Sequence, residues 1–371
     1  MLGRILCTIC LIGVAIHGSV GQSVDRQLQK LSWRGEDLSA FASLVTEGAQ
    51  TDREKLTRIY QWIIYHIRYD YEALRDGNWR INRNSQDILL RGKAICWGYA
   101  TLCKTLLGEV DIQAVVVSGY SRGLPSSGQD SQEPDHAWNA VQVDDEWYLV
   151  DATWDSGILH AMEDFDATAS HYFLSEPAEF LQSHIPAQPM WQLLACPVGL
   201  VNFIERGVNY IAEDDSCYAY SDSIAAYLQL DTLERLLYEA EVQYRFHPTD
   251  ANQDGLAHTL IDYAVSLKEE GDAWAAEGMD SLATNTYQTA LDYFERAGTI
   301  VDFYSWQQEA YAFCHLNLSQ RLYAVSGTDY ELQTVVFHMK QAGQLLQEIS
   351  PSTPMIQNAL EMIKQNLEML K

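Results

Sequence analysis

The chain has 371 residues, of which 47% are hydrophobic and 11% are aromatic. This composition predicts a globular protein that buries a substantial core, and it excludes a disordered chain. The 51 acidic residues outnumber the 24 basic ones and give a formal net charge of -27. Repulsion from phosphate then argues against a nucleic-acid partner.

Residues 1–21 are typical of a signal peptide. Arg4 supplies a positive charge, Ile5 to Ile16 form an apolar stretch, and small residues precede a predicted cleavage after Gly21. No later run reaches the ~18 apolar residues of a membrane span. We therefore expect an exported protein, secreted, periplasmic or at the cell surface, that does not span a membrane once the signal is removed. An uncleaved anchor is the alternative.

Five cysteines follow the predicted signal: Cys96, Cys103, Cys196, Cys217 and Cys314. Their odd number leaves at least one thiol unpaired. Their spacing shows no C-x-x-C pair and no zinc pattern, so we expect neither a disulfide framework nor a metal site. His160, His171 and His184 also lack metal-ligand spacing and are interpreted as packing or surface residues. No cofactor is expected.

A core domain is predicted at residues 51–200, after an N-terminal helical extension at residues 22–50. Thr51 and Glu54 form a capping-box pattern, which marks the start of a helix. The residues that recur at helical spacing after it are Leu56, Ile59, Tyr60, Ile63, Ile64 and Ile67. This periodicity predicts an amphipathic helix that lays one face on the core.

A second core helix is predicted to begin close to Cys96, with apolar spacing that continues to Leu107. A thiol is a strong nucleophile only as the thiolate, which the exposed amides at a helix N-terminus stabilise. Cys96 is therefore a candidate nucleophile. Cys103 lies seven residues further along the same apolar face and is interpreted as a core residue.

A strand at residues 114–118 and then a β-hairpin are predicted downstream. Residues 137–143 and 147–150 alternate around the pair Asp144 and Asp145. Two turn-forming residues between alternating runs indicate a tight hairpin.

The register of this hairpin brings His136 close to Asp151. If the two aspartates are the central turn residues, Val143 pairs with Glu146, and Trp138 lies opposite Asp151. His136 and Asp151 then become diagonal neighbours on one face, with β-carbons roughly 5.5 to 7 Å apart. A carboxylate at that distance can orient an imidazole. A single His and Asp pair is commonly structural, but here it coincides with a cysteine at a helix start.

A connector is predicted at residues 201–247 and an α-helical domain at residues 248–371. Six residues match in order and spacing the packing positions of a tetratricopeptide repeat: Trp274, Gly278, Tyr287, Ala290, Phe294 and Ala297. The pattern favours a degenerate helical-repeat array, and an unrelated helical bundle is the alternative. By analogy of fold alone, such a domain would present a surface to a protein partner.

Three motifs occur in one order along the core. They are Gly-x-x-x-Cys-x-Gly-Tyr-Ala at Cys96, Asp-His-Ala-Trp-Asn-x-Val at His136, and Trp-Tyr-x-x-Asp-x-Thr-Trp at Asp151. Together they resemble the transglutaminase-core superfamily, including its kyphoscoliosis-peptidase type, over about residues 50–200. The resemblance implies an α+β fold with a papain-like transglutaminase core, in which a helix bearing Cys packs on an antiparallel sheet bearing His and Asp. The α-helical repeat domain follows this core.

The resemblance also implies a role for each of these three residues. Cys96 attacks an acyl carbon, His136 acts as general base and acid, and Asp151 holds His136. The acyl group belongs to a glutamine amide or a peptide bond of a protein or peptide substrate, and an amine or water resolves the thioester. Three functions stay open: acyl transfer, hydrolysis by a cysteine peptidase or amidase, and a noncatalytic protein-binding scaffold.

Four further residues belong to the predicted site. The oxyanion is expected to meet the Cys96 amide and one side-chain donor, for which Gln86 and Trp79 are the candidates and Gln86 is preferred. Trp97 and Trp138 are expected beside the acyl group. Trp97 stands where related sequences often carry a polar residue, so the shape of the acyl site departs from the family pattern.

Overall fold

The computed structural model describes residues 26–77, 84–122, 134–161, 170, 172–206, 217, 219–326 and 328–370. The predicted signal peptide lies outside these ranges. The chain packs as two compact units, one of Met1–Val117 with Ala137–Phe180 and one of Ser118–His136 with Leu181–Lys371. None of the helices in the described ranges combines the length and the apolar character that crossing a bilayer requires.

Three helices open the first unit: α1 (Arg26–Lys30), α2 (Leu38–Val45) and α3 (Asp52–His66). The N-terminal extension is thus two short helices, because the Asp37 side chain starts α2 by accepting a bond from the Ala40 amide. The predicted start of α3 is confirmed. The Thr51 side chain accepts from the Glu54 amide, and the Glu54 side chain accepts from the Thr51 amide.

The next segment carries α4 (Tyr71–Arg75), α5 (Ser85–Arg91) and α6 (Cys96–Gly108), together with the short strands β1 (Arg68–Tyr69) and β2 (Lys93–Ala94). The two strands pair in parallel, with Tyr69 opposite Ala94. Gly92 ends α5 in the left-handed conformation, at φ 60°, which glycine adopts without strain. Strand β2 then leads into α6 through a single residue, Ile95.

Four longer strands form one sheet in the order β5-β4-β3-β6. They are β3 (Ala114–Ser121), β4 (His136–Val143), β5 (Glu146–Val150) and β6 (His184–Pro186). The hairpin register is the predicted one, with Val143 opposite Glu146. Asp144 and Asp145 both have positive φ, 54° and 65°, which is the geometry of a two-residue turn that matches strand twist.

The core of the first unit lies between its helices and this hairpin. Apolar side chains of α3 and α6 pack with those of β4 and β5, and all of the following are buried: Leu56, Ile59, Ile63, Tyr99, Leu102, Leu106, Val141 and Val150. The helix α7 (Ala152–Ala161) follows β5 without a loop and packs on α3. The short α8 (Pro177–Phe180) ends the unit.

Besides Ser118–His136, the second unit contains β6 and a one-turn 3₁₀ helix, η3 (Pro189–Gln192), followed by α9 (Leu200–Arg206), α10 (Tyr220–Gln229) and α11 (Thr232–Phe246). Its first core is small and joins Tyr120, Leu181, Ile185 and Phe203. Cys196 and Cys217 form a disulfide. The sequence did not indicate this bond, because it joins residues 21 positions apart with no motif around them.

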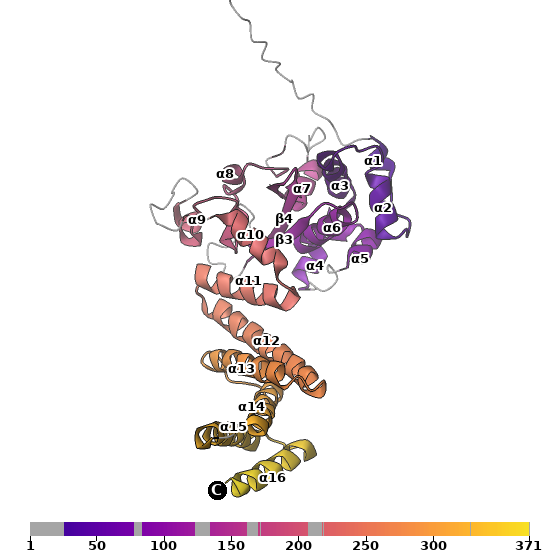
Figure 1. Ribbon diagram of the computed structural model, residues 1–371. Helices are drawn as coiled ribbons and strands as arrows, with labels where there is room; N and C mark the ends of the chain where they lie inside the picture. Colours follow the sequence, from indigo (N-terminus) through magenta and orange to yellow (C-terminus); the bar gives the residue numbers. More distant parts are fainter. Residues whose placement is uncertain are drawn as a thin grey trace, which may run out of the picture. The chain divides into compact units, whose positions relative to one another are not determined.

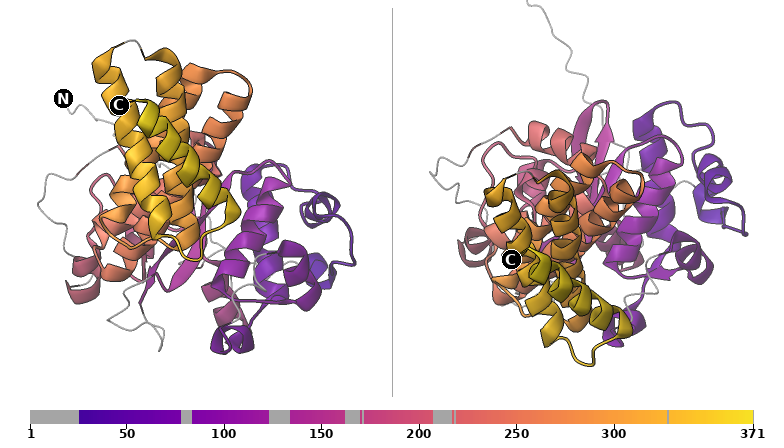
Figure 2. Two further views of the ribbon diagram at one scale, coloured as in Figure 1. Left: turned by 90° about the horizontal axis from the view of Figure 1, so that it is seen from below. Right: turned by 60° about the horizontal axis from the view of Figure 1, so that its bottom comes forward.

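Five helices complete the chain, in orange to yellow in Figure 1: α12 (Asp250–Ala276), α13 (Asp280–Gly298), α14 (Ser305–Val325), α15 (Asp329–Glu348) and α16 (Pro354–Met369). Each packs on the next, and the views of Figure 2 show the same succession. Four of the predicted packing positions, Tyr287, Ala290, Phe294 and Ala297, are buried on α13. Gly278 lies in the turn between α12 and α13, at φ 78°.

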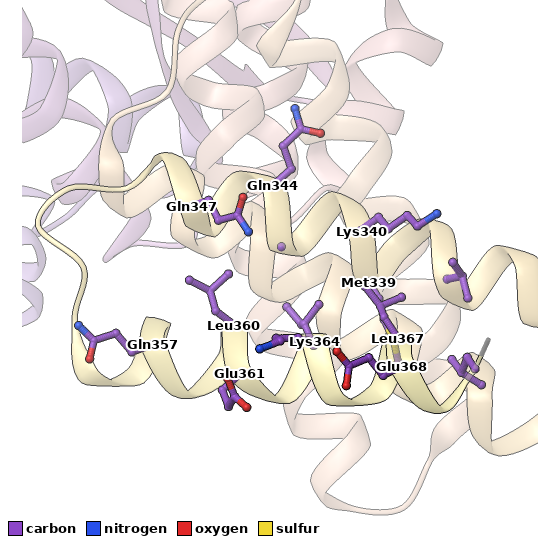
Figure 3. Close-up of a pocket in the computed structure, with 14 residues that line it drawn as sticks. Met339, Lys340, Gln344, Gln347, Gln357, Leu360, Glu361, Lys364, Leu367 and Glu368 are labelled. Atoms are coloured by element: carbon purple, nitrogen blue, oxygen red, sulfur yellow. The ribbon is translucent and has the colours of Figure 1, made fainter.

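A groove of about 750 Å³ lies between α15 and α16. Figure 3 shows its lining, with Met339 on α15 and Leu360 and Leu367 on α16. Lys340 and Lys364 stand beside these apolar side chains. The groove therefore combines an apolar lining with polar edges, as peptide-binding surfaces of helical repeats do.

Candidate active site

Cys96 is the first residue of α6, as the sequence predicted. The residue before it, Ile95, has an apolar side chain that cannot accept a hydrogen bond from the first amides of α6. Cys96 is half-buried, whereas Cys103 and Cys314 are fully buried. Burial raises the pKa of Cys103 to about 12, which suits a packing thiol. Among the described free cysteines, Cys96 is the one that solvent reaches.

His136 and Asp151 stand at the open end of the hairpin. His136 is the first residue of β4, and Asp151 directly follows the last residue of β5. Both are buried, with 5% and 0% of their surface exposed. The register continues the pairing of Asn139 with Val150, so Trp138 lies opposite Asp151 and His136 is the diagonal neighbour. The structure brings the predicted base and acid together.

His184 joins this pair. Nitrogen or oxygen atoms of His136, Asp151 and His184 all lie within 4.8 Å of one another. The rings of His136 and His184 are 5.3 Å apart, and Ser183 Oγ lies 2.7 Å from His184 Nδ1. Two imidazoles and a carboxylate are also donors that a divalent metal accepts. The sequence interpretation of His184 missed this position, because β6 reaches it only through long-range pairing with β3.

Asp151 also caps a helix. Its Oδ1 accepts hydrogen bonds from the amides of Thr153, at 2.7 Å, and Trp154, at 3.2 Å, which is the N-cap arrangement at the start of α7. The Asp151 amide donates to the Tyr172 carbonyl at 2.8 Å. Both capping bonds go to Oδ1, so the cap and an imidazole N–H need not compete for the same oxygen. The local fold thereby fixes the orientation of the carboxylate.

A buried polar network lies behind Asp151. Tyr60 Oη is 2.6 Å from Asp155 Oδ2, and the Ser170 hydroxyl donates to Asp155 Oδ1. Asp155 has no exposed surface. The pKa of its carboxyl is raised to about 7: burial raises it most, the hydrogen bonds of Ser170 and Tyr60 oppose this increase, and the Asp151 charge adds to it. No sequence pattern indicated this network, because Tyr60 and Asp155 are 95 residues apart.

Two further side chains tie the site to the core. Asn139 Nδ2 donates to the Ala100 carbonyl of α6 at 2.9 Å and to the Val115 carbonyl of β3 at 3.1 Å, and so fixes β4 against the cysteine helix. Burial raises the pKa of the Tyr69 phenol, and its electrostatic interaction with Cys96 acts in the same direction. Tyr69 is therefore a protonated donor in the electrostatic neighbourhood of Cys96.

The remaining predicted residues are placed as follows. Trp97 is 43% exposed in the first turn of α6, whereas Trp138 is 1% exposed and packs on Phe180 with ring centroids 5.7 Å apart. Gln86 is exposed in the first turn of α5, and its role as an oxyanion donor stays a prediction. Trp79 lies outside the described residues.

An α+β core with a cysteine at a helix start and a His–Asp pair on an antiparallel hairpin defines a class of thiol-bearing domains related to papain. Residues 39–152 match the family model of the transglutaminase-like superfamily. The chain therefore carries a transglutaminase-like domain, which confirms the family and the fold class that the three motifs predicted.

The chain is similar to several characterised proteins over this region. Kyphoscoliosis peptidase of Mus musculus is 39% identical over 176 residues, which cover 45% of this chain and 26% of that protein. The Homo sapiens protein of the same name is 36% identical over 188 residues, covering 48% and 28%. The Lim and transglutaminase domain protein ltd-1 of Caenorhabditis elegans is 28% identical over 185 residues, covering 45% and 25%. The chain spans about a quarter of the length of these relatives.

Proposed function

We propose that this protein is a transglutaminase-like thiol enzyme that acts on glutamine amide or peptide acyl groups of a protein substrate. The observation that carries the proposal is the buried His136–Asp151 pair at the end of the hairpin. A solvent-accessible cysteine that begins α6 is the second support. Similarity to proteins named as peptidases is the third.

The reaction begins when His136 takes the proton of the Cys96 thiol. The thiolate attacks the acyl carbon, and the oxyanion of the tetrahedral intermediate meets the first amides of α6. His136, kept in its tautomer by Asp151, returns the proton to the leaving amine. A thioester on Cys96 remains. An amine substrate then forms an isopeptide bond, or water hydrolyses the thioester.

The test uses the chain without residues 1–21, a fluorescent primary amine and casein, alongside Cys96→Ala. Amine incorporation that Cys96→Ala abolishes supports acyl transfer, while Cys96-dependent cleavage of casein without incorporation supports hydrolysis. Circular dichroism checks that the variant is folded. If the unmodified protein neither labels nor cleaves a panel of unfolded proteins, the enzymatic proposal is wrong.

A protein-binding scaffold is the second candidate function, and the groove between α15 and α16 favours it. In that case Cys96→Ala would leave the biological role intact. Leu360→Lys, in the groove, would abolish the capture of a protein partner. Opposite sensitivities of the two variants would separate a scaffold from an enzyme.

We also propose that the protein is exported. The signal-like residues 1–21 support this proposal, and so does the Cys196–Cys217 disulfide, because such bonds persist in oxidising compartments. A reporter fused after residue 30 should leave the cell, and replacing the apolar stretch 5–16 with polar residues should retain it. Retention of both fusions would contradict the proposal.

A further inference from the structure

The Tyr60 hydroxyl lies among three oxygen atoms of the segment that bears Asp151. It is 2.9 Å from the Asp151 carbonyl, 2.6 Å from Asp155 Oδ2 and 3.1 Å from the Tyr172 carbonyl. A phenol has one proton to donate, and Tyr60 keeps it because burial raises the pKa of that phenol well above 10. A single donor cannot satisfy three acceptors at once, so the proton on Asp155 decides how the hydrogen bonds are shared.

Two arrangements follow from the position of that proton. When Asp155 is protonated, its O–H donates to Tyr60 Oη, and the Tyr60 proton is directed at the Asp151 carbonyl. When Asp155 is ionised, the Tyr60 proton turns to the Asp155 carboxylate, and the Asp151 carbonyl loses this donor. Ionisation also places a second buried negative charge beside Asp151, where burial makes charges interact strongly.

We propose that Tyr60 and Asp155 are positioning residues of the candidate active site, with protonated Asp155 holding the Asp151 main chain through Tyr60 and ionised Asp155 releasing it. The inference rests on the proposed function, because Asp151 matters for turnover only if His136 and Cys96 react. It adds a regulation to that site: the alignment of Asp151 depends on one proton, which is carried by Asp155, a group that is itself out of reach of solvent.

The groups that face Asp155 support a titration in the accessible range. Tyr60 reaches it from α3, Asp151 precedes its own helix, and Ser170 closes the third side. The Cys103 thiol of α6 interacts with Tyr60, and burial keeps that thiol neutral. With burial raising its pKa to about 7, Asp155 changes charge between mildly acidic and mildly alkaline pH.

The test compares the unmodified protein with Asp155→Asn, whose amide keeps the hydrogen bonds of the protonated acid but cannot ionise. Two rates are measured from pH 5.5 to 8.5: kcat for amine incorporation or cleavage, and alkylation of Cys96 by iodoacetamide. We expect the two proteins to have similar kcat at pH 5.5. The ratio of Asp155→Asn to unmodified kcat should then rise at least about threefold by pH 8.5, with a midpoint near pH 7, because a nearby charge alters such equilibria by roughly a pK unit.

Tyr60→Phe removes the hydroxyl and keeps the ring. It should lower kcat by about tenfold with little change in KM, because it acts on Asp151, the carboxylate that orients His136, rather than on substrate binding. Tyr287→Phe is the matched control: it also removes the hydroxyl of a buried tyrosine, but in α13, and should leave both rates unchanged. A loss of stability alone would not lower kcat while leaving KM unchanged.

The two readouts separate failure of this inference from failure of the proposed function. Alkylation of Cys96 needs no substrate. If the ratio of the Asp155→Asn alkylation rate to the unmodified rate depends on pH in a protein without turnover, the network is supported and the proposed enzymatic function is wrong. If the protein turns over substrate but the ratio of Asp155→Asn to unmodified kcat stays constant across pH, the network is wrong and the proposed enzymatic function stands. If Tyr60→Phe does not fold, Asp155→Asn alone decides, because it retains every hydrogen-bonding group.

Discussion

Replacement of Gly271 by alanine tests how tightly the C-terminal helices pack. A Cβ at this position of α12 would lie 2.7 Å from Tyr287 Cε1 and 2.9 Å from Cδ1, closer than carbon atoms approach. The Tyr287 ring is 1% exposed, and its hydroxyl donates to Asp272 Oδ1 at 2.7 Å, so it has little room to retreat. Overpacking of this kind costs about 1–3 kcal/mol.

Helix propensity acts in the opposite direction. Alanine is better than glycine in a helix interior by about 1 kcal/mol. Because Tyr287 has little room to retreat, we expect the overpacking to exceed this gain, so that Gly271→Ala destabilises the α12–α13 pair by up to about 2 kcal/mol, the difference between the two contributions.

Hydrogen exchange of α13 amides, followed by mass spectrometry in the otherwise unmodified chain, measures this local stability. Gly255→Ala is the control in the same helix, where a Cβ meets nothing within 4 Å, and it should slow exchange. Equal slowing by both alanines would show that Tyr287 moves aside easily, and the packing argument would then be wrong.

Three further predictions concern stability. Because the folded pKa of Asp155 is raised from 3.8 to about 7, the folded state holds this proton more tightly; the resulting stability, up to about 4 kcal/mol, is present below pH 4 and lost as pH rises through 7. Urea unfolding at pH 5 and pH 8 should show a smaller loss in Asp155→Asn, and equal losses would contradict the burial argument. Burial and, to a smaller extent, the neighbouring His338 together lower the pKa of His315 to about 3, so stability from this group is lost as pH falls from 6.5 towards 3. His315→Gln should flatten that acid limb in hydrogen exchange of α14, and an unchanged limb would exclude His315 as its source. Replacing Cys196 and Cys217 together by serine should lower stability by about 3 kcal/mol, as chain entropy predicts for a loop of this length. Coinciding thermal melts of the two proteins would contradict this prediction.

Features encoded by adjacent residues could be predicted from the sequence. The start of α3 followed from Thr51 and Glu54, and the hairpin register followed from Asp144 and Asp145 as turn residues. The closeness of His136 to Asp151 was then a matter of counting along two paired strands.

Features that join distant segments could not be predicted in this way. The Tyr60–Asp155 contact depends on how α3 packs against α7, and His184 depends on the pairing of β6 with β3. Periodicity marked Tyr60 only as an apolar core position, because a phenol on a buried helix face has the same spacing whether or not its hydroxyl finds a partner. The Cys196–Cys217 bond was missed for the same reason.

The double use of Asp151 affects how its presence should be interpreted. Its Oδ1 holds the first turn of α7 through two main-chain amides, so a chain that had lost its chemistry would still lose helix stability if this acid were replaced. Cys96 has no comparable structural duty among the described contacts. In any protein with this fold, retention of the acid at the end of the hairpin can therefore reflect its role in folding alone. Loss of the thiol is the change that would indicate that catalytic activity has been lost.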